Sequence, residues 1–409
     1  MAETPIAASL RRHGLLSLPR ASTEALLESQ MRIGLFGGAG SVPMLPTALC
    51  PFGPLPADTP AAVLLADHET FSVALVTWTD RGPEITERDS FPMPGLDYPS
   101  PWEDLIYLAA ELAEPLIRQA AGACFCYALP AVPAGRDLSA LTPPLRISGA
   151  EGRLLCASLT AELAGRGVEE RPLVALDDAC AALLAATVLA PDADRCLGLS
   201  WGRDVRLSLA APRAAIPKLT GPGSDQGFVL LNTGVAGFTG LPVGDADLIV
   251  DRDAGDAGKN LLRKAAALPN LGETARFTLL KGVEDGLFTF AGGRALLGLT
   301  HLSFEAVDEL LRDRENGLLT TLCPAPEDRE AARGLCTAVC RRAVDLTASA
   351  LSAALRLTGG GRAPCAVVTG GAEHTVLLPM LRQALPDVAL ETPEDAVLIG
   401  AAAGLLRNL

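Results

Sequence analysis

The segment around Asp177 and Asp178 constrains the fold of this chain more than any other. An apolar run from Val174 to Leu176 leads directly into the acidic pair, and small apolar residues occupy most of 179–186. The first run predicts a buried strand, and the second predicts a helix that begins at the pair. A carboxylate at such a junction lies at the mouth of an α/β crevice, where it can accept a proton from a substrate hydroxyl. Asp178 is therefore our candidate for the catalytic base of a phosphoryl transfer.

Three other roles remain open for this pair. Asp178 can simply cap the following helix, because aspartate is common at the N-cap and stabilises a helix by about 1 kcal/mol there. The two carboxylates can instead bind Mg²⁺ together, or they can share one proton as a like-charged pair.

Composition and charge exclude several classes of protein. Hydrophobic residues form 49% of the 409 residues and charged residues 20%, which allows a large core and is unlike a disordered chain. The net charge of -14 argues against non-specific binding to nucleic acid or anionic membranes. No apolar run is long enough to span a bilayer, and residues 1–18 lack the order of a signal peptide. We therefore expect a cytoplasmic location, without a nucleic-acid or membrane partner.

The ten cysteines and four histidines show neither a disulfide framework nor metal-ligand spacing. Most cysteines fall in apolar segments, as Cys124 and Cys126 do, so we expect buried free thiols. The histidines are scattered along the chain, which favours surface or turn positions. No metal site is predicted.

Strand and helix patterns divide the chain into two α/β halves. Residues 1–60 predict a leader and a proline-rich loop, 61–194 a small lobe, and 195–409 a large lobe with a C-terminal helix. Each lobe opens with a strand–turn–strand unit, at 61–78 and at 197–209.

Further elements follow from the same patterns. A strand is predicted at 123–129, and strand–turn–helix units are predicted at 366–385 and 388–405. Helices are predicted at 23–31, 101–120, 151–166, 257–280 with a break at Pro269, and 326–357. This layout predicts a two-lobed α/β fold with a central cleft. It resembles the actin-like ATPase fold, in which both lobes are ribonuclease H-like.

A series of short motifs strengthens that resemblance. The motifs occupy residues 41–47, 125–130, 148–152, 174–180, 256–264, 271–273, 393–395 and 400–402. Their sequences, such as Met-Leu-Pro-Thr at 44–47 and Ser-Gly-x-Glu-Gly at 148–152, resemble those of the hexokinase family. Each motif is weak alone, but their order and near-constant spacing identify the chain as a member of that family over nearly its whole length.

The resemblance implies an ATP-dependent kinase that uses Mg²⁺ and phosphorylates a hexose, with Asp178 in the place of the catalytic aspartate. The substrate would contact positions that match the family's sugar pocket: Thr142, Asp177, Asn232, Asn260 and Arg263. The nucleotide would bind at two turns that match its phosphate and adenosine sites: Gly202, Arg203 and Arg206, and Thr369, Gly370 and Gly371.

The phosphate turns depart from the family pattern. The first turn, Asp-Leu-Gly-Gly-Thr-Asn in the family, has no glycine at 65–70 and carries the carboxylates of Asp67 and Glu69. A solvated hairpin tip is favoured there over a metal ion held by either carboxylate. The second turn keeps only Gly202, and its arginines can either pair with an anion or form a solvated turn with Asp204. The turn at 369–371 can seat the nucleotide or be a tight turn only.

The sugar pocket departs further from the family. Ala128, Pro143, Asp177, Arg206 and Gly234 stand where the family has Ser, Lys, Asn, Asn and Glu. The family's Glu-Lys-Met glutamate is Arg263, which indicates an anionic substrate such as a sugar acid or sugar phosphate.

Two hypotheses follow from these similarities and departures. The chain is an ATP-dependent kinase of a sugar or sugar-like alcohol, but not an ordinary glucokinase. Alternatively, it is a catalytically inactive protein that binds a sugar or nucleotide and has a regulatory role. In both cases a small sugar-like molecule is the expected partner, and the sequence does not indicate an oligomeric state.

Overall fold

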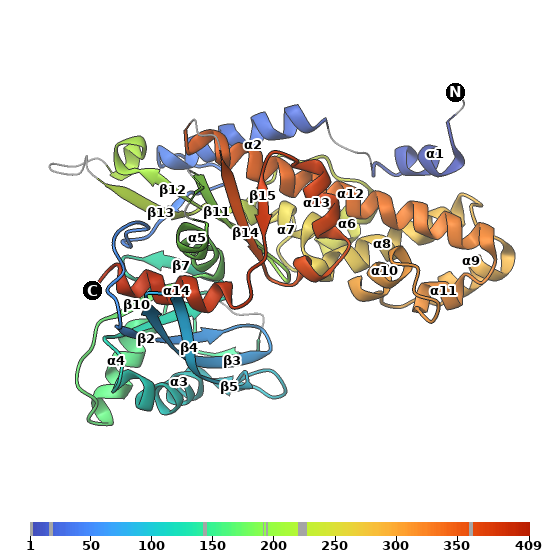
Figure 1. Cartoon of the computed structure of the whole chain (residues 1–409). Helices are drawn as coiled ribbons and strands as arrows, with labels where there is room; N and C mark the ends of the chain where they lie inside the picture. The colour runs from blue at the N-terminus through green and yellow to red at the C-terminus, as the bar shows by residue number, and fades with distance from the viewer. Residues whose placement is uncertain are drawn as a thin grey trace.

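Two β-sheets with helices packed on them form two lobes (Figure 1). The computed structural model describes residues 3–15, 19–141, 145–190, 192–193, 195–219, 227–359 and 363–409. The small-lobe sheet has the strand order β10-β6-β2-β3-β4, and the large-lobe sheet has the order β1-β13-β12-β11-β14-β15. The predicted two-lobed α/β arrangement is therefore present.

The small lobe is built on the predicted hairpin. Strands β2 (Pro60–Ala66) and β3 (Thr70–Thr79) pair antiparallel, and β4 (Gly82–Pro92) extends the sheet beyond β3. Strands β6 (Ala123–Tyr127) and β10 (Leu173–Leu176) add to the other side in parallel. Every residue of β6 is buried, as its unbroken apolar run requires for a central parallel strand. Strand β4 was not predicted, because its mostly exposed, polar residues lack the alternation of a half-buried strand.

Two predicted helices cover one face of this sheet, namely α3 (Trp102–Ile117) and α4 (Leu155–Gly165). Short strand pairs complete the lobe. Strand β5 (Ser100–Pro101) pairs with β9 (Ile147–Ser148), and β7 (Ala131–Ala134) pairs with β8 (Asp137–Ala140).

The large-lobe sheet combines an antiparallel half with a parallel half. Strands β11 (Arg195–Trp201), β12 (Val205–Pro212) and β13 (Phe228–Asn232) form the antiparallel half. Strands β14 (Pro364–Thr369) and β15 (Ala389–Glu391) continue in parallel from β11. The strand–turn–strand and strand–turn–helix predictions are confirmed, with α13 (Leu377–Ala384) after β14.

A long helix organises the rest of this lobe. Helix α12 (Pro326–Leu357) matches its predicted bounds and packs against α8 (Leu268–Glu284) and α13. The remaining helices extend away from the small lobe (Figure 1). They are α6 (Asp245–Asp253), α7 (Leu261–Ala266), α9 (Phe290–Leu297), α10 (Phe304–Leu311) and α11 (Leu318–Leu322).

The break predicted in this region lies two residues earlier than expected. Ala267 has extended backbone angles and separates α7 from α8, whereas Pro269 is the second residue of α8. Proline is tolerated there because the first turn of a helix has no internal partner for its N–H group.

The segment predicted to be a leader packs into the large lobe. Helix α2 (Arg20–Leu35) lies along α12, and α1 (Pro5–Arg12) contacts α8 and α12. Strand β1 (Leu45–Pro46) pairs with β13 at the edge of the sheet. Leu27 and Met31 of α2 are fully buried in the core of this lobe. Spatially, then, residues 1–60 belong mostly to the large lobe.

Two helices from distant parts of the sequence lie side by side between the sheets. They are α5 (Asp178–Leu189) and α14 (Ala396–Leu406), and their apolar residues share a core with β2, β6 and β10 (Figure 1). A Cβ on Gly400 would lie 1.8 Å from the carbonyl oxygen of Ala181. The two backbones approach this closely only because a glycine stands at their contact. This packing places the first residue of α5 in the cleft between the lobes.

All ten cysteines are free thiols, and eight of them are buried, as expected; Cys50 is exposed and Cys196 is partly buried. Within the described residues, none of the helices combines the length and apolar character needed to cross a membrane.

Candidate functional site

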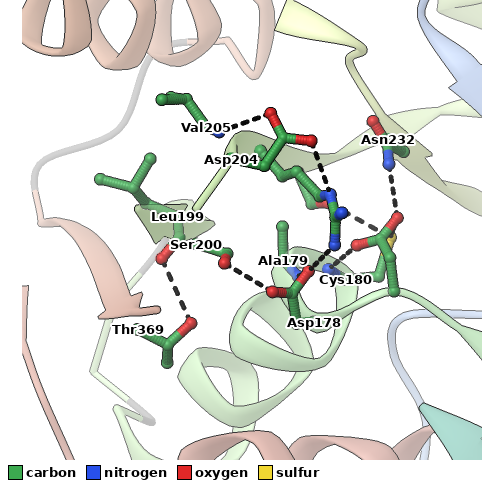
Figure 2. Close-up of polar contacts among 12 residues, drawn as sticks. Asp178, Ala179, Cys180, Leu199, Ser200, Asp204, Val205, Asn232 and Thr369 are labelled. Atoms are coloured by element: carbon green, nitrogen blue, oxygen red, sulfur yellow. Dashed lines mark hydrogen bonds and ion pairs between the residues drawn. The ribbon is translucent and has the colours of Figure 1, made fainter. Parts of the chain in front are cut away.

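The two aspartates at the start of α5 have different roles. Asp177 keeps an extended backbone and is the N-cap, and its Oδ1 accepts a hydrogen bond from the backbone N–H of Cys180 at 2.7 Å. Its Oδ2 accepts from the side-chain amide of Asn232 (Figure 2). The capping role proposed for Asp178 is therefore wrong, because Asp177 is the N-cap and Asp178 is the first helical residue, with its side chain in the cleft.

Asp178 is held by two neighbours from the second strand–turn–strand unit. Its Oδ1 accepts from Nη1 of Arg206 at 2.8 Å, and its Oδ2 accepts from the hydroxyl of Ser200 at 2.6 Å (Figure 2). The side chains of Asp178 and Arg206 are 12% and 9% exposed, so the ion pair is shielded from water. Both carboxylate oxygens are thus engaged, which leaves Asp178 poorly placed to accept a substrate proton in this geometry.

Burial and charge shift the pKa values of the groups around this ion pair. Burial raises the pKa of Asp177, and the adjacent Asp178 carboxylate raises it further. Burial alone would lower the pKa of Arg206, but Asp178 and Asp204 outweigh it and raise the pKa. The cluster therefore favours a charged Arg206 and disfavours a second negative charge on Asp177.

The first phosphate turn uses its own carboxylate where the family has glycines. Oδ1 of Asp67 accepts from the backbone N–H groups of Glu69 and Thr70 at 2.7 and 2.6 Å. Its Oδ2 accepts from the Thr70 hydroxyl at 3.0 Å. These backbone donors are consumed within the turn and are not available to a phosphate. The turn is the hairpin tip that was predicted, but it is closed by Asp67 rather than left to solvent.

An ion pair joins the two phosphate turns across the cleft. Nη2 of Arg203 donates to Oε1 of Glu69 at 2.7 Å, and the side chains are 53% and 65% exposed. This pair connects the β2–β3 turn of the small lobe to the β11–β12 turn of the large lobe. The carboxylate of Glu69 is thereby neutralised by the chain itself.

Close packing explains why the second turn keeps a glycine at Gly202. A Cβ on Gly202 would lie 1.8 Å from the carbonyl oxygen of Gly370, so the two turns touch through their backbones. Gly370 and Gly371 have φ values of 98° and 111°, which glycine adopts without strain. The backbone N–H of Gly371 donates to the carboxylate of Glu373 at 2.7 Å. A tight turn at 369–371 accounts for the backbone contact, the two positive φ values and the hydrogen bond to Glu373.

Two cavities lie on either side of Arg206. The turn cavity, of about 330 Å³, is lined by the turns at 67–70 and 202–206 together with Ala128, Asp178, Ser200 and Gly370. The interlobe cavity, of about 550 Å³, is lined by residues between 40 and 45, by 130–132, and by parts of 204–263. Asp204 and Arg206 line both cavities, whereas Asp178 lines only the turn cavity.

The predicted substrate residues divide between these spaces. Asn232, Asn260 and Arg263 line the interlobe cavity, Asp177 lines neither cavity, and Thr142 lies outside the described residues. The Asn232 side chain is occupied, because its Nδ2 donates to Asp177 and its Oδ1 accepts from the N–H of Gly234.

Asp256 binds the side chains of Asn260 and Arg263, the other two predicted substrate contacts. Its Oδ2 accepts from Nδ2 of Asn260 at 2.8 Å and from Nη2 of Arg263 at 3.0 Å. Lys264 also pairs with this carboxylate. Arg263 is therefore partly neutralised, which weakens the argument from this residue alone for an anionic substrate.

The predicted nucleotide residues are also divided. Gly202, Arg203, Arg206 and Gly370 line the turn cavity, whereas Thr369 and Gly371 do not. Thr369 is buried, and its hydroxyl lies 3.5 Å from the carbonyl oxygen of Leu199 (Figure 2).

Sequence reasoning missed Ser200 and Lys259. Ser200 lies near the end of a predicted strand whose neighbouring residues are apolar. This one polar side chain, just before Trp201, was the only signal in the sequence. Lys259 stands beside Asn260 within a family motif, but no charge pattern marked it as a cavity residue.

His68 provides a pH-dependent test of the turn cavity. Burial lowers the pKa of His68 from its ordinary value of 6.5, and the charges of Arg206 and Arg203 lower it further. As the pH falls through 6.5, the unfolded chain takes up this proton before the folded chain does, so folding stability decreases. We expect urea unfolding to show a larger loss of stability from about pH 7 to about pH 5 in the wild type than in His68→Gln. The exposed His374→Gln is the control, and an equal loss in all three proteins would contradict the prediction.

Comparisons with known proteins identify relatives of this chain. The hexokinase family profile matches residues 197–404, just over half of the chain. Hexokinase-7 from Oryza sativa subsp. japonica is 26% identical over 294 residues, which are 64% of this chain and 62% of that protein. Hexokinase-like 1 protein from Arabidopsis thaliana is 30% identical over 148 residues, which are 36% of this chain and 29% of that protein. The chain therefore matches less than two thirds of the length of either relative.

A solved structure extends the likeness to both lobes. The hexokinase from Schistosoma mansoni complexed with glucose superposes with a TM-score of 0.80 at 19% identity, over 99% of this chain and 99% of that one. At this identity the match shows the fold, and it confirms the predicted two-lobed, actin-like arrangement. Together, the family profile and the shared fold show that this chain belongs to the hexokinase family.

Proposed function

We propose that this chain binds a small sugar or sugar derivative in the interlobe cavity and does not transfer a phosphoryl group to it from ATP. One observation carries the proposal: Arg206 and Ser200 hold both oxygens of Asp178, and Asp178 does not line the interlobe cavity. A general base must come within hydrogen-bond distance of the hydroxyl that it deprotonates. A ligand in the interlobe cavity meets Arg206 instead of this base.

The turn cavity supports the same proposal because its residues do not fit a nucleoside triphosphate. Four carboxylates and two guanidinium groups line it, which gives an excess of negative charge. Asp67 consumes the backbone donors of the first turn, and Glu69 is paired with Arg203. Phosphate oxygens would meet like charges at short range, and such contacts are costly where water is excluded. The lining of the turn cavity therefore does not fit the triphosphate of ATP.

The second candidate function is an ATP-dependent kinase of a sugar or sugar-like alcohol. The position of Asp178 favours it, since this residue begins a helix at the cleft, where the family has its catalytic aspartate. Activity would require Arg206 to leave Asp178 and Arg203 to leave Glu69 when the ligands bind. The two candidate functions therefore differ in whether these two ion pairs break when the ligands bind.

Two measurements on the full chain distinguish the candidates. Calorimetry with neutral and acidic sugars is expected to show binding that Ala236→Phe removes, because this side chain would fill part of the interlobe cavity. The matched control is Ala254→Phe, at the exposed end of α6. A coupled assay of ADP release with the same sugars and ATP-Mg²⁺ is expected to show no turnover. Turnover that Asp178→Asn abolishes would overturn the proposal and establish the kinase.

A further inference from the structure

We infer that the ligand of the interlobe cavity is a sugar carboxylate and that Arg206 receives its carboxylate through Nη2. This inference rests on the proposed function, since it names the chemical class that the same cavity selects. It assigns to Arg206 a role in specificity in addition to its ion pair with Asp178.

Within the described residues, Arg206 has one unused hydrogen-bond donor, at Nη2. Nη1 of Arg206 donates to Asp178, and Nε lies 3.5 Å from Oδ2 of Asp204. Nη2 is buried and makes no hydrogen bond to any of the residues that the structure describes. A buried donor without a partner costs about 1–3 kcal/mol, so such groups usually meet an acceptor in a ligand or in water. Arg206 lines both the turn cavity and the interlobe cavity, and the four carboxylates of the turn cavity disfavour an anionic acceptor there. An acceptor in the interlobe cavity would meet Nη2 after a small movement of this buried side chain.

The wall of the interlobe cavity carries more basic than acidic side chains. Arg206, Lys259 and Arg263 line the interlobe cavity, with Arg263 partly neutralised by Asp256, and Asp204 is the only acidic residue among its described lining residues. Lys259 is exposed and forms no ion pair in the described parts of the chain. The ammonium group of Lys259 can therefore support an anion that enters from solvent.

The acidic residues beside Arg206 favour a bound carboxylate over a bound phosphate. Asp178 and Asp204 already compensate the charge of Arg206, and both lie within ion-pair distance of it. A dianionic phosphate near these two carboxylates would be repelled more strongly than a singly charged carboxylate. The carboxylate is therefore the anion that one free guanidinium nitrogen and one rim ammonium can hold, with sugar hydroxyls in the rest of the cavity.

Calorimetry with potassium D-glucuronate, D-glucose and D-glucose 6-phosphate tests this inference on the full chain. Glucuronate is expected to bind at least about 10-fold more tightly than glucose, as one charge-assisted hydrogen bond supplies this difference. Glucose 6-phosphate is expected to bind more weakly than glucuronate. Arg206→Lys keeps a cation beside Asp178 but lacks Nη2, and it should weaken glucuronate binding about 10-fold and glucose binding less.

Two surface variants separate a local effect from a general electrostatic one. Lys259→Gln should weaken glucuronate binding several-fold and reduce its dependence on salt. Arg294→Gln, an exposed substitution on α9, should change neither. Glucose or glucose 6-phosphate that binds as tightly as glucuronate, or glucuronate binding that is insensitive to Arg206→Lys, would overturn this inference alone. If none of the three sugars binds, the proposed function is overturned as well.

Discussion

Replacing Arg206 with leucine is expected to lower the free energy of unfolding by about 3–5 kcal/mol. The substitution removes the partner of a buried carboxylate and leaves Asp178 charged, with only the Ser200 hydroxyl and backbone donors near it. Asp177, directly beside it, would be forced further towards its protonated form. Urea unfolding followed by tryptophan fluorescence measures the loss, because Trp201 is buried at the end of the same strand as Ser200.

A neighbouring arginine offers a matched control for this experiment. Arg203 lies in the turn just before β12, but its ion pair with Glu69 is exposed, so Arg203→Leu should change stability by no more than about 1 kcal/mol. Adding Asp178→Asn to Arg206→Leu should recover much of the lost stability, because the uncompensated charge is then removed. Equal effects of the two arginine substitutions would show that burial does not strengthen the Arg206 pair.

Substituting Gly400 with alanine is expected to destabilise the fold by at least about 3 kcal/mol, at the upper end of the range for overpacking. The new Cβ would lie 1.8 Å from the carbonyl oxygen of Ala181 and 2.9 Å from the backbone nitrogen of Ala185. Both contacts are with helix backbone, which cannot rotate away as a side chain does. The helices α5 and α14 would have to separate, and the start of α5, with Asp178, would move with them.

Gly165 provides the control for this substitution. It is also helical, at the end of α4, but a Cβ there would meet nothing within 4 Å. Gly165→Ala should leave stability unchanged or increase it by up to about 1 kcal/mol, since alanine favours helix more than glycine does. Chemical denaturation of both variants checks the comparison. If Gly400→Ala is tolerated as well as Gly165→Ala, the proposed contact between the α5 and α14 backbones is wrong.

Local patterns predicted the elements that are strongly apolar or regularly spaced. The hairpin of β2 and β3, the buried strand β6 and the long helix α12 were all placed to within a few residues. Strand β4 and the short helices α9 to α11 escaped, since β4 is polar and exposed and the helices are too short to show a clear period. The leader was misplaced because its burial depends on α12, which lies about three hundred residues away along the chain.

The site shows the same division between local and distant information. The sequence marked Asp178 at a strand-to-helix junction and showed that the phosphate turns lack glycine. It could not show that Arg206 bonds Asp178, since 28 residues separate them and the contact requires α5 to pack on β12. It also could not show that the Asp67 carboxylate accepts from the N–H groups of its own turn, because this depends on backbone direction.

The sequence by itself determined the family, most of the longer strands and helices, and the placement of an acidic pair at the start of α5. These properties follow from local periodicity and from motif order, and both can be recognised without knowing any tertiary contact. Only the tertiary structure decided which of the two aspartates caps the helix and which faces the cleft. It also showed that Arg206 stands between Asp178 and the interlobe cavity. The physical reason is that hydrogen bonds and ion pairs depend on distances of a few ångströms between side chains from different elements, and packing sets these distances.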